Sequence, residues 1–335
     1  MGSVGRGGSG ESLASERPTV LYIVGAGRSG STVFERLLGG FPGFVNVGEL
    51  VEVFRQIAPR NERCGCGSLF EDCPFWQGVG ERAFGGWDPD LVQENALRQR
   101  RVARQRYLVK LASERLRDRH FENDLAKYCE VQFKLYQAIQ QESKADVIVD
   151  ASKAVAPLVA LRNEGRIDLR VLHLVRDVRG VSYSWAKSDV RRPHATDEGR
   201  DTMAKFSIGL TSARWTRMET QAALVTAVMK PSVTVRYEDL VTNPRKTTEE
   251  ALSALGLGGF WRQGTHLRGN VAMLPPSHGI SGNPSRFTTG EVTLRADEQW
   301  RSKLRRRDRA VSTALGVLPL MAHGYFRTSS GESDG

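Results

Sequence analysis

The N-terminal part of the chain contains the segment Val20-Leu21-Tyr22-Ile23-Val24-Gly25-Ala26-Gly27-Arg28-Ser29-Gly30-Ser31-Thr32-Val33-Phe34-Glu35-Arg36-Leu37-Leu38. Residues 20–24 form an uninterrupted apolar run, which is typical of a buried β-strand. A glycine-rich turn follows, and the residues after it have the apolar spacing of an amphipathic helix. The segment therefore predicts a strand, a tight turn and a helix in direct succession.

The turn has the spacing of a phosphate-binding P-loop, G-x-x-x-x-G-K-[ST], at Gly25, Gly30 and Thr32, but Ser31 stands where the P-loop has its lysine. Because that lysine contacts the β- and γ-phosphates of a nucleoside triphosphate, its absence argues against hydrolysis of ATP or GTP. Backbone N–H groups at a helix N-terminus still bind a phosphate-like anion. We expect the anion to be held by Gly27, Arg28, Ser29, Gly30, Ser31 and Thr32.

Short apolar runs alternate with helical patterns along the chain, at Val20–Val24, Asp146–Val149, Leu169–Val175 and Ser232–Val235. This alternation predicts an α/β fold, a P-loop-like three-layer sandwich whose mainly parallel central sheet is flanked by helices. Ligands of such sheets bind beyond the carboxyl ends of the strands. The candidate ligand-binding segments are therefore Gly25–Thr32, Asp150–Lys153, Arg176–Gly180 and Arg236–Leu240.

The size of the chain fits a single enzyme domain, since its 335 residues are 40% hydrophobic. We expect one domain over residues 18–325, between a disordered leader over 1–17 and a disordered tail over 326–335. No run of eighteen apolar residues occurs, so we expect no transmembrane segment. The leader lacks the apolar core of a signal peptide, and we expect a cytoplasmic protein.

The formal net charge of +10 is compatible with three kinds of partner: nucleic acid, an anionic surface or a polyanionic small molecule. No nucleic-acid-binding motif is visible in the sequence. We therefore expect a basic cleft for a small polyanion and no nucleic-acid partner.

A second candidate phosphate site lies at Arg176, which ends a buried apolar run, and at Ser184, two helical turns later. A guanidinium fork and a hydroxyl facing one cleft suit a phosphate group. The pair resembles the 3′-phosphate motif of sulfotransferases, and Gly25–Thr32 resembles their 5′-phosphosulfate loop. The resemblance is to the bacterial, carbohydrate- and tyrosylprotein-type branch of that family, and it implies 3′-phosphoadenosine-5′-phosphosulfate (PAPS) as co-substrate.

The segment His278–Gly290 has the composition of a long loop, and long loops in compact domains are often lids or binding loops. Its Gly-Asn-Pro-x-Arg-Phe stretch resembles the loop that closes over the nucleotide in bacterial and carbohydrate-type sulfotransferases. The resemblance implies that Arg286 reaches the 3′-phosphate and that Gly290 lets the loop pass closely. The alternative is a surface loop with no ligand.

The proton acceptor is implied by the resemblance at Glu49, because tyrosylprotein and several carbohydrate sulfotransferases use the glutamate of a Gly-Glu pair here. The histidine that the cytosolic enzymes use is missing from Ser152–Pro157. The same resemblance assigns Lys153 to the bridging oxygen and Arg28 to the sulfuryl oxygens, with no catalytic metal. For Glu49 the structural alternative is a helix N-terminal carboxylate satisfied by the helix dipole.

Three of the four cysteines, Cys64, Cys66 and Cys73, lie close together in the sequence. Three thiolates suit zinc, with Cys129 or His120 as the fourth ligand. A disulfide and a reduced structural loop packed through the neighbouring Pro-Phe-Trp are the alternatives. The sequence leaves these three open.

The motifs together imply an enzyme that transfers a sulfuryl group from PAPS to a hydroxyl, or else an amine, and releases adenosine 3′,5′-bisphosphate. The alternatives are a small-molecule P-loop kinase, with Asp150 as its magnesium ligand, and a non-catalytic nucleotide-binding protein. We expect the acceptor to be a small molecule, a glycan or a peptide. The sequence specifies neither the identity of the acceptor nor the oligomeric state of the protein. We expect its pocket to be walled by Glu52–Trp87, the basic helices up to Gln141, and Arg191–Arg217.

Overall fold

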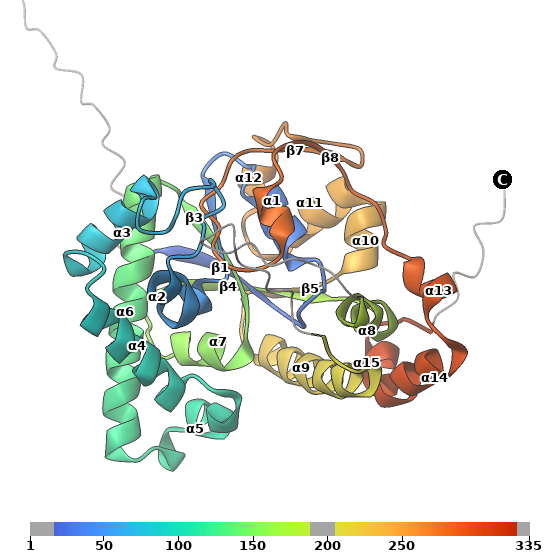
Figure 1. The fold of residues 1–335 in the computed structure, drawn as a ribbon, viewed down its shortest axis with the longest axis horizontal. Helices are drawn as coiled ribbons and strands as arrows, with labels where there is room; N and C mark the ends of the chain where they lie inside the picture. The colour runs from blue at the N-terminus through green and yellow to red at the C-terminus, as the bar shows by residue number, and fades with distance from the viewer. Residues whose placement is uncertain (1–16, 188–204, 327–335) are drawn as a thin grey trace, which may run out of the picture.

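The computed structural model describes residues 17–187 and 205–326 (Figure 1). Apart from Arg17 and Phe326, the leader and tail expected from the sequence lie outside the described residues, and so does the segment 191–204 of the expected acceptor wall.

The centre of the molecule is a parallel five-stranded sheet with the strand order β2-β3-β1-β4-β5. The strands are β1 (Thr19–Val24), β2 (Phe44–Gly48), β3 (Val147–Lys153), β4 (Asp168–Val175) and β5 (Ser232–Arg236). The four apolar runs all form strands of this sheet. The fifth strand, β2, lies at one edge of the sheet beside β3. The predicted α/β architecture is confirmed.

The side chains of β1 alternate between the two faces of the sheet, as the two-residue period of a strand requires. Val20, Tyr22 and Val24 belong to the core on one face, and Leu21 and Ile23 belong to the core on the other. All five are at most 1% exposed. A strand buried on both faces needs a continuous apolar run rather than an alternating one, and this explains the pattern in the sequence.

Helices cover both faces of the sheet, which makes the predicted three layers (Figure 1). One face carries α1 (Ser31–Leu38), α10 (Tyr237–Thr242), α11 (Pro244–Ala254) and α12 (Gly258–Trp261). The other carries α6 (Arg119–Ser143), α7 (Val155–Leu161) and α9 (Ile208–Val228), with α2 (Ala58–Arg60), α3 (Pro74–Phe84), α4 (Pro89–Val102) and α5 (Leu108–Ala112) beside α6. Against α9 pack α8 (Val178–Ala186), α14 (Arg306–Leu315) and α15 (Val317–Ala322), and α13 (Gln299–Lys303) packs against α8.

A second, antiparallel sheet was not expected from the sequence. It consists of β6 (Leu267–Arg268), β7 (Val271–Leu274) and β8 (Gly290–Thr293). Gly290 was expected to let a lid pass over the nucleotide, but it opens β8 with a φ of +84°, a left-handed conformation that glycine adopts without steric cost. Strands of two to four residues are too short to give a clear two-residue period, so the sequence pattern does not reveal them.

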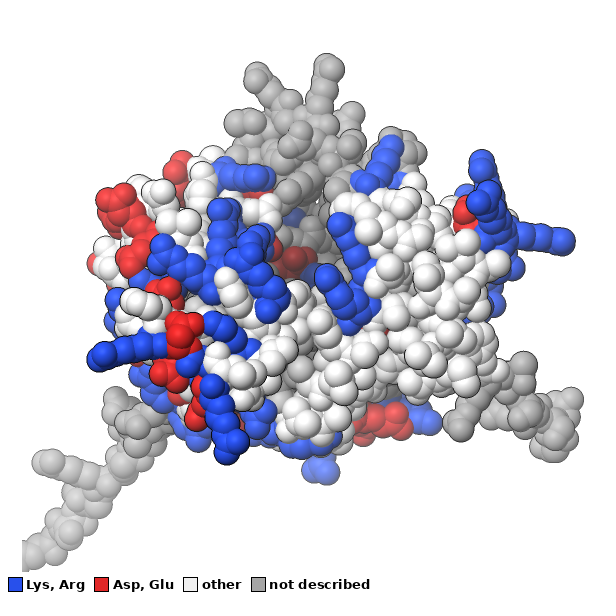
Figure 2. All heavy atoms as spheres, turned by 90° about the horizontal axis from the view of Figure 1, so that it is seen from below, with Lys and Arg blue, Asp and Glu red and all other residues white. Residues whose placement is uncertain are grey.

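None of the helices in residues 17–187 and 205–326 is both long and apolar enough to cross a membrane. On the face seen in Figure 2, Lys and Arg side chains form separate groups with uncharged surface between them, and acidic side chains are interspersed among those on the left. This face therefore presents no continuous basic stripe of the kind that tracks a nucleic-acid backbone, as far as the described residues show.

Candidate active site

A cavity of about 580 Å³ lies beyond the carboxyl ends of the central strands. It brings together nine of the twelve residues that the sequence selected, from four segments of the chain. These are Gly27, Arg28, Gly30, Ser31, Thr32, Glu49, Lys153, Arg176 and Ser184. Ser29, Arg286 and Gly290 do not line it.

The glycine-rich turn has the geometry of a backbone cradle. A Cβ atom on Gly25, which has a φ of +149°, would lie 2.3 Å from the carbonyl oxygen of Leu174. Gly30 has a φ of +89° and lies against the ring of Tyr237, and α1 begins at the next residue. The N-terminus of α1 therefore opens onto the cavity, where its N–H groups and dipole favour an anion.

Arg28 adopts a left-handed backbone conformation, with a φ of +71°, that a non-glycine residue adopts only at a cost. Its guanidinium lies 5.0 Å from the ring centroid of Trp185, whose Nε1 donates to the carbonyl oxygen of Gly27. Burial lowers the pKa of Arg28, and the Glu49 carboxylate acts in the opposite direction. The turn thus holds a partly desolvated cation beside its backbone N–H groups.

Glu49 and Lys153 form an ion pair in the cavity, with side chains 18% and 16% exposed. Lys153 ends β3 with a φ of +63°, and its Nζ also donates to the carbonyl oxygen of Ala151 at 3.1 Å. The N–H of Glu49 donates to the carbonyl oxygen of Ile280 at 2.8 Å. A carboxylate and an ammonium are therefore fixed next to each other at the ends of β2 and β3.

Arg176 is buried and donates to the carbonyl oxygens of Arg28 and Asp297, both at 3.1 Å. The guanidinium also lies 4.4 Å from the ring centroid of Tyr237 and 3.4 Å from the Asp297 carboxylate. Ser184, two residues before the end of α8, lines the same cavity. The two residues thus meet at one cavity, as their spacing predicts.

Two lining residues, Asp297 and Trp185, lie outside every segment that the sequence selected. Glu52 and Phe206, by contrast, belong to two of the segments expected to wall the acceptor pocket, and Tyr237 belongs to the candidate segment Arg236–Leu240. Partial burial raises the pKa of Asp297, but Lys187 and Arg176 outweigh it and lower the pKa overall. Asp297 has no local signal, because it reaches Arg176 from a segment 121 residues away.

Arg286 lies outside the cavity lining, in contrast to the expected contact with a 3′-phosphate. It is 2% exposed, and its guanidinium donates to the carbonyl oxygens of Gly282 at 3.5 Å and Arg63 at 3.2 Å. Its own carbonyl oxygen accepts from Arg36. In this arrangement Arg286 holds the 282–287 segment to α1 and to the cysteine-containing loop.

Asp150, the magnesium ligand of the alternative kinase, and His278 also lie outside the cavity lining. Asp150 is buried and accepts hydrogen bonds from Tyr136 at 2.6 Å and from the backbone and hydroxyl of Ser152 at 2.8 and 2.5 Å. His278 contacts Cys64 and Cys73.

Glu35 is a buried carboxyl on the first helix, behind the glycine-rich turn, and its Oε2 accepts no hydrogen bond from the described residues. Burial raises its pKa to about 8. Because this pKa exceeds the ordinary value of 4.5, the folded protein holds a proton there that the unfolded chain releases. The contribution of this carboxyl to the free energy of unfolding is fully present below about pH 4.5, and it is lost as the pH rises through about 8.

We expect Glu35→Gln to remove this loss. The difference in unfolding free energy between the variant and the parent protein should grow in favour of the variant by on the order of 2–4 kcal/mol from about pH 5 to pH 8. Denaturant unfolding at several pH values measures the difference. An identical pH dependence in both proteins would contradict the assignment of a buried neutral carboxyl.

Over 111 residues the chain is 32% identical to carbohydrate sulfotransferase 1 of Rattus norvegicus and of Mus musculus. The matched region covers 31% of this chain and 27% of each relative. This segment of the chain is therefore similar to part of a carbohydrate sulfotransferase. The match spans only about a quarter of the length of these curated relatives. No protein-family model matches the chain.

Solved sulfotransferase structures are also similar to the chain. The sulfotransferase domain of the Synechococcus PCC 7002 olefin synthase has a TM-score of 0.47 and 20% identity, covering 90% of this chain and 94% of that one. The sulfotransferase domain from the curacin biosynthetic pathway has a TM-score of 0.43 and 14% identity, covering 89% of this chain and 97% of that one.

Proposed function

We propose that this protein is a PAPS-dependent sulfotransferase that transfers a sulfuryl group to an acceptor hydroxyl or amine and releases adenosine 3′,5′-bisphosphate. The observation that carries the proposal is one cavity lined by three features. They are a P-loop-like turn without the lysine of a triphosphate site, the Arg176–Ser184 pair, and the Glu49–Lys153 ion pair.

The residues of the cavity fit the two anionic ends of such a donor. The N-terminus of α1 and Arg28 would bind the 5′-phosphate and the sulfuryl oxygens, because N–H groups and a guanidinium stabilise the charge on them. Arg176 and Ser184 would bind the 3′-phosphate. The Asp297 carboxylate beside Arg176 is an internal anion that a 3′-phosphate would have to share or displace.

In the reaction, Glu49 would take the proton of the acceptor hydroxyl as its oxygen bonds to sulfur. The bond between sulfur and the bridging phosphate oxygen breaks, and that oxygen leaves with the electron pair and the negative charge. Lys153 would neutralise this charge. Because Lys153 contacts Glu49, we infer that its ammonium turns toward the bridging oxygen when the donor binds, which frees the carboxylate to act as a base.

The experiment for this function uses the purified full chain, PAPS and a panel of small-molecule, glycan and peptide acceptors. We expect mass spectrometry to find a product heavier by one SO₃ group together with adenosine 3′,5′-bisphosphate. Intact PAPS with every acceptor, together with consumption of ATP in the presence of magnesium, would favour the kinase instead. The acceptor that reacts also defines the substrate class, which the sequence leaves open.

Turnover should not require magnesium, because the charges on the donor would be met by Arg28, Lys153 and Arg176. We expect the rate to be unchanged when magnesium is omitted and when a magnesium chelator is added. Loss of activity that magnesium restores would contradict the proposal and support a kinase-like site.

The bacterial origin and cytoplasmic location expected from the sequence remain predictions.

A further inference from the structure

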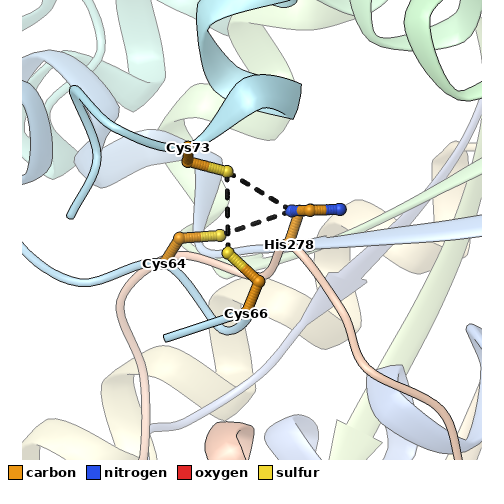
Figure 3. A group of neighbouring side chains, drawn as sticks. All are labelled: Cys64, Cys66, Cys73 and His278. Atoms are coloured by element: carbon orange, nitrogen blue, oxygen red, sulfur yellow. Dashed lines mark hydrogen bonds between the residues drawn. The ribbon is translucent and has the colours of Figure 1, made fainter. Parts of the chain in front are cut away.

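Four side chains of the metal-ligating type converge outside the cavity (Figure 3). Cys64, Cys66 and Cys73 point toward one another and toward His278, more than 200 residues away in the sequence. The sulfur atoms and a ring nitrogen of the four residues all lie within 4.8 Å of one another. The fourth member is His278, and not the expected Cys129 or His120.

The distances match the edges of a tetrahedron. The Sγ atoms of Cys66 and Cys73 are 3.7 Å apart, and Nδ1 of His278 lies 3.6 Å from Sγ of Cys64 and 3.4 Å from Sγ of Cys73. With Zn–S bonds of about 2.3 Å and Zn–N bonds of about 2.0–2.1 Å, a tetrahedral site has S–S edges of about 3.8 Å and S–N edges of about 3.5 Å. A disulfide needs sulfur atoms about 2.05 Å apart and would leave one thiol and the imidazole unused.

The loop around the cysteines is held in a defined shape by its backbone. Within the loop, the N–H of Gly67 donates to the carbonyl oxygen of Cys64, and the N–H of Cys64 donates to that of Ser68, both at 2.9 Å. The N–H of Gly65 donates to the carbonyl oxygen of Gly279 at 2.9 Å, which brings the loop to the histidine segment.

His278 is oriented by the helix that follows Cys73. Its ring stacks on Phe75 with a centroid distance of 4.6 Å and an interplanar angle of 12°. Nε1 of Trp76 donates to the backbone carbonyl oxygen of His278 at 2.9 Å. The loop and the start of α3 thus orient the imidazole toward the three thiols.

We propose that Cys64, Cys66, Cys73 and His278 bind one structural zinc ion. Four protein ligands fill the tetrahedral coordination and leave no open position for a substrate or a water, so the site is structural rather than catalytic. Zinc binding replaces the protons of the three thiols and leaves the imidazole neutral. The metal site does not depend on the proposed function.

The zinc site would also brace one wall of the cavity. Two residues after His278, Ile280 pairs with the end of β2, where it accepts from the N–H of Glu49 at 2.8 Å and donates to Val47 at 3.0 Å. A Cβ on Gly282 would lie 3.1 Å from Oε1 of Glu49, which shows how closely this segment passes the carboxylate. Zinc binding would therefore fix the segment that contacts Glu49. An effect of zinc on turnover rests on the proposed role of Glu49 as the base.

The test is the metal content of the full-length protein after purification without added zinc or chelator. We expect about one zinc per chain by elemental mass spectrometry, and almost none in the Cys66→Ser/Cys73→Ser double variant. Cys129→Ser is the matched control, since the Cys129 thiol is buried on α6 and donates to the carbonyl oxygen of Ala160 instead. Cobalt substitution in the unmutated chain should give the visible absorption bands of tetrahedral thiolate-bound cobalt.

Three results would overturn the proposal. The first is a chain without zinc whose four thiols all react under native or denaturing conditions and that shows no cobalt spectrum. The second is an intact mass two hydrogens lower, which indicates a disulfide. The third is equal zinc loss in Cys129→Ser and the double variant. Because these readouts need no turnover, failure of the zinc site is distinguishable from failure of the proposed sulfuryl transfer.

Discussion

Replacement of Glu49 by glutamine is expected to reduce turnover by about 10²–10⁴-fold, the usual contribution of a general base. Glutamine keeps the size and shape of the side chain and removes its affinity for a proton. Nucleotide affinity should stay nearly unchanged, because the phosphate groups are expected to contact the N-terminus of α1 and Arg176 rather than Glu49. Single-turnover transfer from labelled PAPS, combined with calorimetric titration of nucleotide, measures both quantities.

Glu52→Gln is the matched control, since Glu52 lines the same cavity and is paired with Arg55 at 3.0 Å. A loss of less than roughly tenfold in Glu49→Gln would exclude Glu49 as the base. A large loss in Glu52→Gln alone would transfer the role to Glu52. His278 does not line the cavity and contacts the cysteine cluster, so it is not a candidate for the base.

Replacement of Arg176 by alanine is expected to weaken binding of adenosine 3′,5′-bisphosphate by about 10–100-fold, equivalent to a charge-assisted hydrogen bond of about 1.5–3 kcal/mol. Binding of adenosine 5′-monophosphate, which lacks the 3′-phosphate, should change little. Ser184→Ala should show the same selectivity with a smaller effect, because it removes a neutral hydroxyl. Calorimetric titration of both nucleotides against both variants gives the comparison.

Arg179→Ala is the control for a lost arginine three residues further along the chain, in the first turn of α8. Its guanidinium pairs with Asp177 at 2.5 Å and does not line the cavity, so both nucleotides should keep their affinity. Since Arg176 also bonds two backbone carbonyl oxygens, thermal unfolding of Arg176→Ala checks that the cavity wall is intact. Equal losses for both nucleotides in a folded Arg176→Ala protein would refute the 3′-phosphate assignment.

The features that the sequence predicted well are those that depend on a few consecutive residues. The apolar run and glycine-rich turn at 20–30 predict β1 and the cradle at α1, because burial on both faces and a left-handed turn each need particular local residues. The segments after β1, β3 and β4 meet in one cavity because parallel strands end at one edge of the sheet.

The features that the sequence did not predict depend on contacts between distant segments. The cysteines could be grouped by their spacing, but the approach of His278 follows from the pairing of Ile280 with the end of β2. Asp297 reaches Arg176 across 121 residues. Arg286 was expected at a phosphate but donates to carbonyl oxygens in the protein interior, since a sequence motif does not specify which way a long side chain turns.

The central claim, that the cavity is built for a 3′-phosphorylated adenine nucleotide, is tested most directly by calorimetric titration of the unmutated chain. The titrants are adenosine 3′,5′-bisphosphate, adenosine 5′-monophosphate and ATP with magnesium. We predict that adenosine 3′,5′-bisphosphate binds at least about tenfold more tightly than the other two, in line with one additional charge-assisted contact. Tightest binding of ATP with magnesium, or no binding of adenosine 3′,5′-bisphosphate, would contradict the account.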